Sequence, residues 1–331
     1  MLQSRAPGHK SLIAFRYLAL ASSMAALAQI TLGGVVRVTG SGLGCPDWPL
    51  CHGQIIPPLD FATLVEYSHR LSASALSILV LATLTLAWVF LRNNRWALWA
   101  SAIGMGLVVI AAALGGATVL TELSWWIRLI HLAIAEGVVA CMVVATVAGW
   151  RSGNLDVALK GNQEMNQITD GFRRHLYVTL AAVLLLILSG SFMVGYGAGS
   201  ACATWPLCRG SLLPEGGVFA VHMGHRYFAA IVGLMTAGAA AMAWKRRGAS
   251  FALGVTGMGL AGLFMLQILA GAATVWSGFS ADMKATHLSL ATLVWMSLVF
   301  MTAQVIVPAW SEANQRAPSI SSTSPVEGVT S

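Results

Sequence analysis

Charged residues are scarce in this chain: Lys, Arg, Asp and Glu together make up 9% of its 331 residues, whereas 57% are hydrophobic. Soluble domains carry about 25% charged residues, so the composition excludes a soluble globular protein. The net charge of +7 does not indicate nucleic-acid binding, because membrane proteins concentrate Lys and Arg in their cytoplasmic loops. The composition predicts an integral membrane protein that contacts lipid and no nucleic acid.

Apolar runs long enough to span a membrane recur along the chain. About 20 apolar residues cross a bilayer as a helix, and eight such runs are present, at 13–36, 65–90, 97–120, 127–149, 176–198, 219–243, 250–275 and 285–308. The predicted fold class is therefore an all-α integral membrane protein with eight transmembrane helices.

Lys and Arg are distributed unevenly between the loops. Loops after the even-numbered runs are rich in cations, namely Arg92, Arg95, Arg151, Lys160, Arg173, Arg174, Lys245, Arg246 and Arg247. Because cations concentrate in cytoplasmic loops, we expect both termini on the cytoplasmic side of the cell (plasma) membrane. The loops that contain cysteine pairs are then expected on the outer side.

An internal repeat divides the chain into halves. The matching positions, 156 or 157 residues apart, are His69–Arg70 with His225–Arg226, His131 with His287, Cys45 with Cys202, and Cys51 with Cys208. Repetition at one offset indicates duplication and predicts two pseudo-symmetric four-helix bundles. The predicted boundaries are a cytoplasmic tail at 1–12, an N-terminal half at 13–149, a cytoplasmic linker at 150–175, a C-terminal half at 176–308 and a disordered cytoplasmic tail at 309–331.

Four histidines are the candidate metal ligands. His69, His131, His225 and His287 each lie a few residues into a run that starts on the outer side, so their depths are similar. Two imidazoles on neighbouring helices can bind the iron of a haem from its two faces. The alternatives are hydrogen-bonded interfacial histidines and a zinc or copper site, for which neither half offers a third ligand at familiar spacing apart from Glu66.

Ionisable neighbours distinguish the two halves. Glu66 precedes His69 by three positions, where the second half has His222 before His225. Residues three apart share a helix face, so Glu66 is a candidate proton carrier, with an ion pair to Arg70 or Arg37 as the alternative. Arg70 and Arg226 are candidate contacts for haem propionates, or else interfacial arginines. The sequence assigns no role to Glu136, a second acid within a membrane span, and the alternative is an ion pair with Arg128.

The cysteines occur in two Cys-x5-Cys loops. Cys45 and Cys51 form one pair, and Cys202 and Cys208 form the other. In an oxidising outer compartment we expect a disulfide in each. A redox-active role for the first pair stays open, because exposed, strained disulfides are the labile ones.

These motifs together resemble one known family. The loop Gly40-Ser41-Gly42-Leu43-Gly44-Cys45-Pro46-Asp47-Trp48-Pro49-Leu50-Cys51, with Glu66-x-x-His69-Arg70, His131-Leu132, His222-x-x-His225-Arg226 and His287-Leu288, is similar to haem A synthase. The resemblance extends from Gly33 to Leu290, nearly the whole chain.

The resemblance implies an eight-helix membrane oxidoreductase. Members oxidise a ring methyl of haem O to a formyl group by successive hydroxylations, giving haem A for terminal oxidase assembly. Carried over to this chain, His225 and His287 would be the iron ligands of a haem b. His69 and His131 would bind the substrate haem O, and Glu66 would match an essential glutamate.

Two other function classes fit the four histidines. One is a dihaem b-type electron-transfer cytochrome that oxidises quinol, and the other is a haem carrier or chaperone. Conversion of haem O separates the synthase from both. By resemblance, the expected partners are a haem O synthase (a farnesyltransferase) and terminal oxidase assembly factors, and a homo-oligomer is left open.

Overall fold

Eight long helices make up the computed structural model, which describes residues 9–153 and 169–311. The helices in the described residues are α1 (His9–Val38), α2 (Phe61–Phe90), α3 (Arg95–Leu120), α4 (Trp125–Trp150), α6 (Asp170–Gly195), α7 (Gly217–Lys245), α8 (Phe251–Trp276) and α9 (Ala281–Ile306). All eight are long and apolar enough to cross a membrane. The predicted fold class is confirmed.

Several helices begin earlier than the apolar runs that predicted them, because polar residues cap them. Asp60 accepts a hydrogen bond from the Thr63 backbone N–H and caps α2. Thr169 caps α6 in the same way through Phe172, so this helix starts inside the predicted linker. A side-chain acceptor at the N-cap satisfies a backbone donor that the helix leaves unpaired. Hydropathy alone does not detect such polar first turns.

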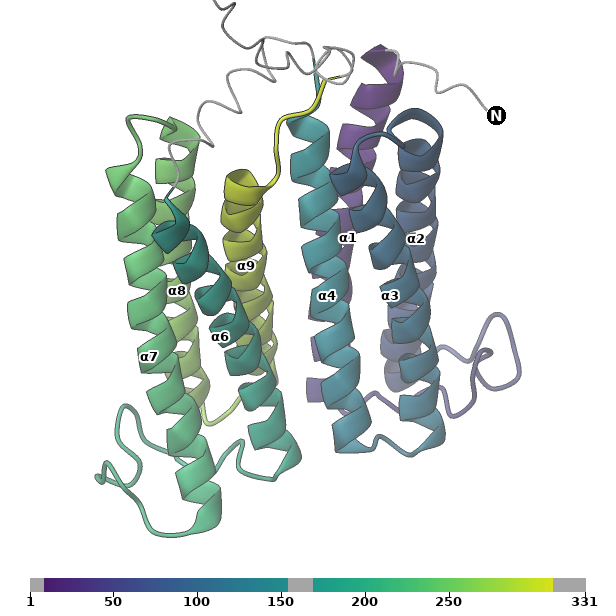
Figure 1. Ribbon diagram of the computed structural model, residues 1–331. Coiled ribbons are helices and arrows are strands. Elements are labelled where there is room, and N and C mark those ends of the chain that lie inside the picture. The colour runs from purple at the N-terminus through teal and green to yellow at the C-terminus, as the bar shows by residue number, and fades with distance from the viewer. Residues whose placement is uncertain (1–8, 154–168, 312–331) are drawn as a thin grey trace, which may run out of the picture.

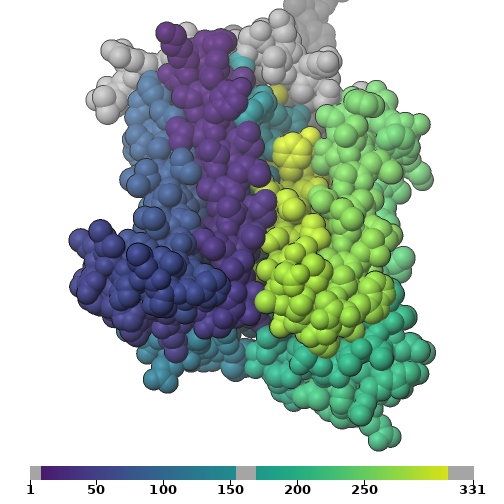
Figure 2. Space-filling view, turned by 180° about the vertical axis from the view of Figure 1, so that it is seen from behind, coloured from purple at the N-terminus to yellow at the C-terminus, as the bar shows by residue number. Residues whose placement is uncertain are grey.

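The helices form two four-helix groups that meet along a seam (Figure 1). α1 to α4 pack together, α6 to α9 pack together, and contacts of α4 and α1 with α9 join the groups. The two central helices, α4 and α9, are the most buried of the eight. Figure 2 shows α1 beside α9 along this seam.

The ends of the described chain differ from the predicted boundaries. Residues 9–12, predicted as tail, belong to α1. Trp310 pairs with the chain after α4: its N–H donates to the Arg151 carbonyl at 3.0 Å, and its carbonyl accepts from Gly153 N–H at 3.1 Å. The start of the predicted C-terminal tail is therefore ordered. The rest of that tail (312–331), the linker core (154–168) and residues 1–8 lie outside the described residues.

Both Cys loops lie at one end of the molecule, the end where α2, α4, α7 and α9 begin (Figures 1 and 2). We call this the Cys-loop end. All four candidate histidines lie in the second or third turn of those helices. The fold therefore gives the histidines similar depth, two in each bundle.

Candidate functional site

Each of the four histidines packs against a glycine of the preceding helix. A Cβ added to the glycine would stand 3.0 to 3.6 Å from the imidazole Cε1, in the pairs Gly33–His69, Gly115–His131, Gly190–His225 and Gly271–His287. In the tightest pairs an added methyl group would force the imidazole to move by a few tenths of an ångström, so the missing side chain leaves the space that the ring occupies. The glycines follow the same repeat as the histidines.

The structure brings the histidines together in two couples. His69 and His131 interact electrostatically in the N-terminal half, and His225 interacts with His287 in the C-terminal half. We call these the N-terminal and C-terminal imidazole couples.

A serine orients the ring of His225. The Ser189 hydroxyl donates to the Leu186 carbonyl at 2.7 Å, and its oxygen lies 2.7 Å from His225 Nδ1. One hydroxyl proton cannot serve both contacts, so when it goes to the Leu186 carbonyl the oxygen accepts from Nδ1–H of the neutral His225 ring. This tautomer leaves Nε2 unprotonated, which is the form that binds a metal. Nothing in the sequence pattern pointed to Ser189.

A glutamine orients the ring of His69. The Gln29 amide nitrogen lies 3.1 Å from His69 Nδ1 and 3.4 Å from Nε2, and it donates to the His69 carbonyl at 3.1 Å. Ser72 donates to the Gln29 side-chain oxygen. The C-terminal couple also has an amide contact, because the Gln267 amide nitrogen lies 3.4 Å from His287 Nε2.

The donor set fits a haem better than a bare metal ion. The Nδ1 atoms of His131 and His287 are buried and have no hydrogen-bond partner within the described part of the chain. In the same residues, no group of three or more His, Cys, Asp or Glu side chains could hold a metal ion. Structural zinc takes four protein ligands and catalytic zinc three, whereas a porphyrin supplies four nitrogens and needs only axial imidazoles.

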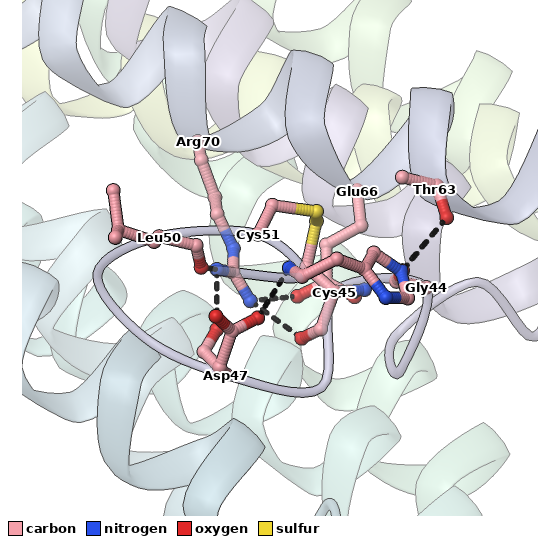
Figure 3. Close-up of polar contacts among 9 residues, drawn as sticks. Gly44, Cys45, Asp47, Leu50, Cys51, Thr63, Glu66 and Arg70 are labelled. Atoms are coloured by element: carbon pink, nitrogen blue, oxygen red, sulfur yellow. Dashed lines mark hydrogen bonds and ion pairs between the residues drawn. A yellow bond between two sulfur atoms is a disulfide. The ribbon is translucent and has the colours of Figure 1, made fainter. Parts of the chain in front are cut away.

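Arg70 and Glu66 clasp the first Cys loop (Figure 3). The Arg70 guanidinium donates to the carbonyls of Cys45 (2.8 Å), Asp47 (2.6 Å) and Leu50 (2.7 Å). It also forms an ion pair with Glu66 at 2.6 Å. The second Glu66 oxygen accepts from the Cys45 N–H at 3.2 Å. Glu66 is therefore buried one helical turn from His69 and joined to the loop, and the Arg70 fork is occupied by the protein itself.

The loop also packs closely on the start of α2. A Cβ at Gly44 would stand 2.3 Å from the Ala62 carbonyl oxygen, so only glycine fits there. The Thr63 hydroxyl donates to the Gly44 carbonyl at 2.8 Å. Asp47 accepts backbone hydrogen bonds from Gly53 (2.7 Å) and His52 (2.6 Å), and these bonds hold the pKa of its carboxyl below the usual value.

His222 takes the place of Glu66 in the second half. Arg226 donates to the carbonyls of Cys202, Thr204 and Pro206 at 2.8 to 3.2 Å. It also donates to His222 Nε2 at 3.2 Å, while His222 Nδ1 donates to the Ala198 carbonyl at 2.9 Å. Both contacts are satisfied by a neutral imidazole. The clasp of the first loop is thus a charge-neutral pair, whereas that of the second carries the charge of Arg226.

Both predicted disulfides form. Cys45 bonds to Cys51 with a Cα–Cα distance of 4.7 Å, and Cys202 bonds to Cys208 with a distance of 4.9 Å.

Glu136 lies away from the Cys loops, at the seam. It is fully buried, and one carboxyl oxygen accepts from the Thr292 hydroxyl of α9 at 2.8 Å. Trp295 Nε1 donates to the Glu136 carbonyl at 2.9 Å. The other carboxyl oxygen has no partner in the described residues. The alternative of an ion pair with Arg128 is not observed.

Fold and site define a multi-pass membrane protein of two duplicated bundles, each with a couple of histidines at the Cys-loop end. A family model described as cytochrome oxidase assembly protein (COX15-CtaA) matches residues 16–64, 60–299 and 217–324. The chain belongs to this family.

Several similar proteins are named heme A synthase. That of Exiguobacterium sp. is 26% identical over 277 residues, covering 82% of this chain and 87% of the relative. That of Geobacillus kaustophilus is 30% identical over 231 residues, covering 68% and 70%. That of Alkalihalophilus pseudofirmus is 28% identical over 214 residues, covering 64% and 69%.

Proposed function

We propose that the protein is a haem A synthase, which oxidises a ring methyl of haem O to a formyl group and gives haem A for terminal oxidases. The observation that carries the proposal is the pair of imidazole couples, of which only the N-terminal one has a buried carboxyl, Glu66, one turn away. Family membership and the names of the similar proteins support it.

The two couples take different haems in this proposal. His225 and His287 hold a resident haem b, and His69 and His131 bind haem O as substrate. The Ser189 contact supports the first assignment, because a hydrogen-bond partner on one ring nitrogen orients a histidine that binds a metal through the other. Glu66, which is buried one turn from His69 where the second half has His222, supports the second assignment.

The haems supply the redox chemistry when bound. The residues of this chain hold the macrocycle and handle protons around it. Glu66 is placed to do so, since residues three apart on a helix share a face and its carboxyl is shielded from solvent. Arg70 and the Cys45 N–H hold that carboxyl in one position. The Cys45–Cys51 loop covers it and restricts water, which strengthens electrostatic interactions at the site.

The expected contact of Arg70 and Arg226 with haem propionates stays a prediction. Both guanidiniums donate to carbonyls of their Cys loops. A propionate contact therefore requires guanidinium N–H groups that are not used in these hydrogen bonds.

Sidedness follows from the same proposal. The Cys-loop end faces the outer side of the plasma membrane, and both termini face the cytoplasm. Persistent disulfides are typical of oxidising compartments, and the cation-rich loops lie at the opposite end. Haem O synthase and oxidase assembly factors as partners, and a homo-oligomer, stay predictions.

Conversion of added haem O tests the proposal. The purified protein, with its resident haem, is given haem O, a reductant and oxygen, and the extracted porphyrins are analysed by mass. We expect the masses of the hydroxylated intermediate and of haem A. Unchanged haem O under conditions where the resident haem is reduced and reoxidised would favour the electron-transfer cytochrome; unchanged haem O without electron flow would favour a carrier.

A further inference from the structure

Two arginines at the Cys-loop end have no acidic partner in the part of the chain that the structure describes. Arg37 lies in the last turn of α1, and Arg128 lies in the first turn of α4. These helices pack together, and the two guanidiniums interact electrostatically with each other. Neither side chain forms a hydrogen bond or ion pair with another described residue, and Arg128 Nε is buried without a partner. Two like charges in a partly buried place are unfavourable unless an anion compensates them.

The helical register places these arginines directly beside the N-terminal imidazole couple. Arg37 follows Gly33 by four residues, and Gly33 is the glycine that contacts the His69 ring. Arg128 precedes His131 by three residues. Residues three or four apart lie on the same helix face. Both guanidiniums therefore stand about one turn nearer the Cys-loop end than the couple, on the faces that carry it.

The nearby acids are already occupied or lie elsewhere. Glu66 pairs with Arg70. Glu136 follows Arg128 by eight residues, a rise of about 12 Å along the helix, and it bonds to Thr292 of the other half. Glu122, in the turn before α4, is exposed and forms no ion pair with a described residue. The alternatives of Arg37 pairing with Glu66 and Arg128 pairing with Glu136 are not observed.

We propose that Arg37 and Arg128 bind the two propionate carboxylates of the porphyrin held by His69 and His131. This inference rests on the proposed function of that couple. A guanidinium presents a planar fork of donors that matches a carboxylate. A porphyrin between the two imidazoles, with its propionates directed toward the Cys-loop end, brings two anions to the place where two unpaired cations stand.

The repeat makes this clamp specific to one half. Lys284 corresponds to Arg128, and Val194 corresponds to Arg37 at the offset that relates Gly33 to Gly190. The C-terminal couple therefore has neither fork. The two sites differ in how they recognise porphyrin carboxylates, and the site assigned to the exchanging substrate is the one with two arginines.

Porphyrins with and without free carboxylates test the inference. The purified protein, with its resident haem, is titrated with iron protoporphyrin IX and separately with the dimethyl ester, and binding is followed in the haem absorption spectrum. Arg37→Gln and Arg128→Gln should each weaken binding of the free acid about tenfold or more, the value for one lost charge-assisted hydrogen bond. Binding of the ester should not change.

The controls separate this inference from the proposed function. Lys284→Gln should leave both titrations as in the wild type, and an unchanged resident spectrum shows that each variant is folded. An equal loss for acid and ester, or no loss for the acid, would overturn the clamp. His69→Ala should abolish binding of both porphyrins; if it does not, the ligand assignment fails irrespective of the arginines.

Discussion

The Thr292 hydroxyl donates to the Glu136 carboxyl at 2.8 Å, and these two residues are 156 positions apart in the sequence. This is the offset of the internal repeat, so the bond joins equivalent positions of the two bundles across the seam. Both side chains are fully buried. At this contact between the two halves, one bundle has a carboxyl and the other has the hydroxyl that donates a hydrogen bond to it.

Breaking this bond should destabilise the seam. Thr292→Val leaves a buried carboxyl oxygen without its donor, which costs about 1–3 kcal/mol. Thr292→Val, Glu136→Leu and the double variant form a double-mutant cycle, measured by denaturant unfolding in mixed micelles. The coupling free energy of the two residues should lie between about 0.5 and 3 kcal/mol. Strictly additive losses would mean that the bond contributes nothing to the association of the halves.

The glycine opposite His287 should be needed for haem binding. In Gly271→Ala the new Cβ would stand 3.0 Å from the ring Cε1, and it must displace the imidazole. We expect the resident haem spectrum to be shifted or lost. Gly259→Ala on the same helix is the matched control, because nothing lies within 4 Å of its Cβ. Equal spectra for both variants would argue against a positioning role of Gly271.

Glu66→Gln should separate proton handling from structure. The amide oxygen can still accept from Arg70 or from the Cys45 N–H, so the loop clasp and the haem content should remain near normal. Formation of haem A from added haem O should stop. If all bound haem is lost, the carboxyl acts mainly as a structural anchor of the loop.

Protonation of Asp47 should loosen the first Cys loop in acid. The pKa of Asp47 is lowered in the folded protein, so its bonds to Gly53 and His52 stabilise the loop above the unfolded pKa, and this contribution is lost as pH falls through the folded pKa. Thr204, which does not titrate, occupies the equivalent place and accepts from Arg209 N–H at 2.9 Å. Hydrogen exchange of the His52 and Gly53 backbone amides, corrected for intrinsic rates, should therefore accelerate at low pH. Asp47→Asn should remove this acid dependence; its persistence would assign the effect to another titratable group.

Much of the fold could be predicted from sequence because a bilayer imposes long apolar runs and the repeat fixes their grouping. The histidine couples followed from depth and offset. Ser189 and the glycine contacts did not, because small residues are common in membrane helices and their meaning depends on which face they present. The dipeptides His69–Arg70 and His225–Arg226 predicted a propionate contact for both arginines, and this stays a prediction. The sequence could not show that both arginine side chains donate to carbonyls of the Cys loops.

The most direct test of the account is the haem spectrum of histidine variants, with haem O uptake measured on the same samples. His225→Ala or His287→Ala should abolish the resident b-type spectrum. His69→Ala or His131→Ala should preserve that spectrum while abolishing both uptake and formation of haem A. A resident spectrum that survives His287→Ala, or that disappears in His69→Ala, would contradict the assignment of the two couples.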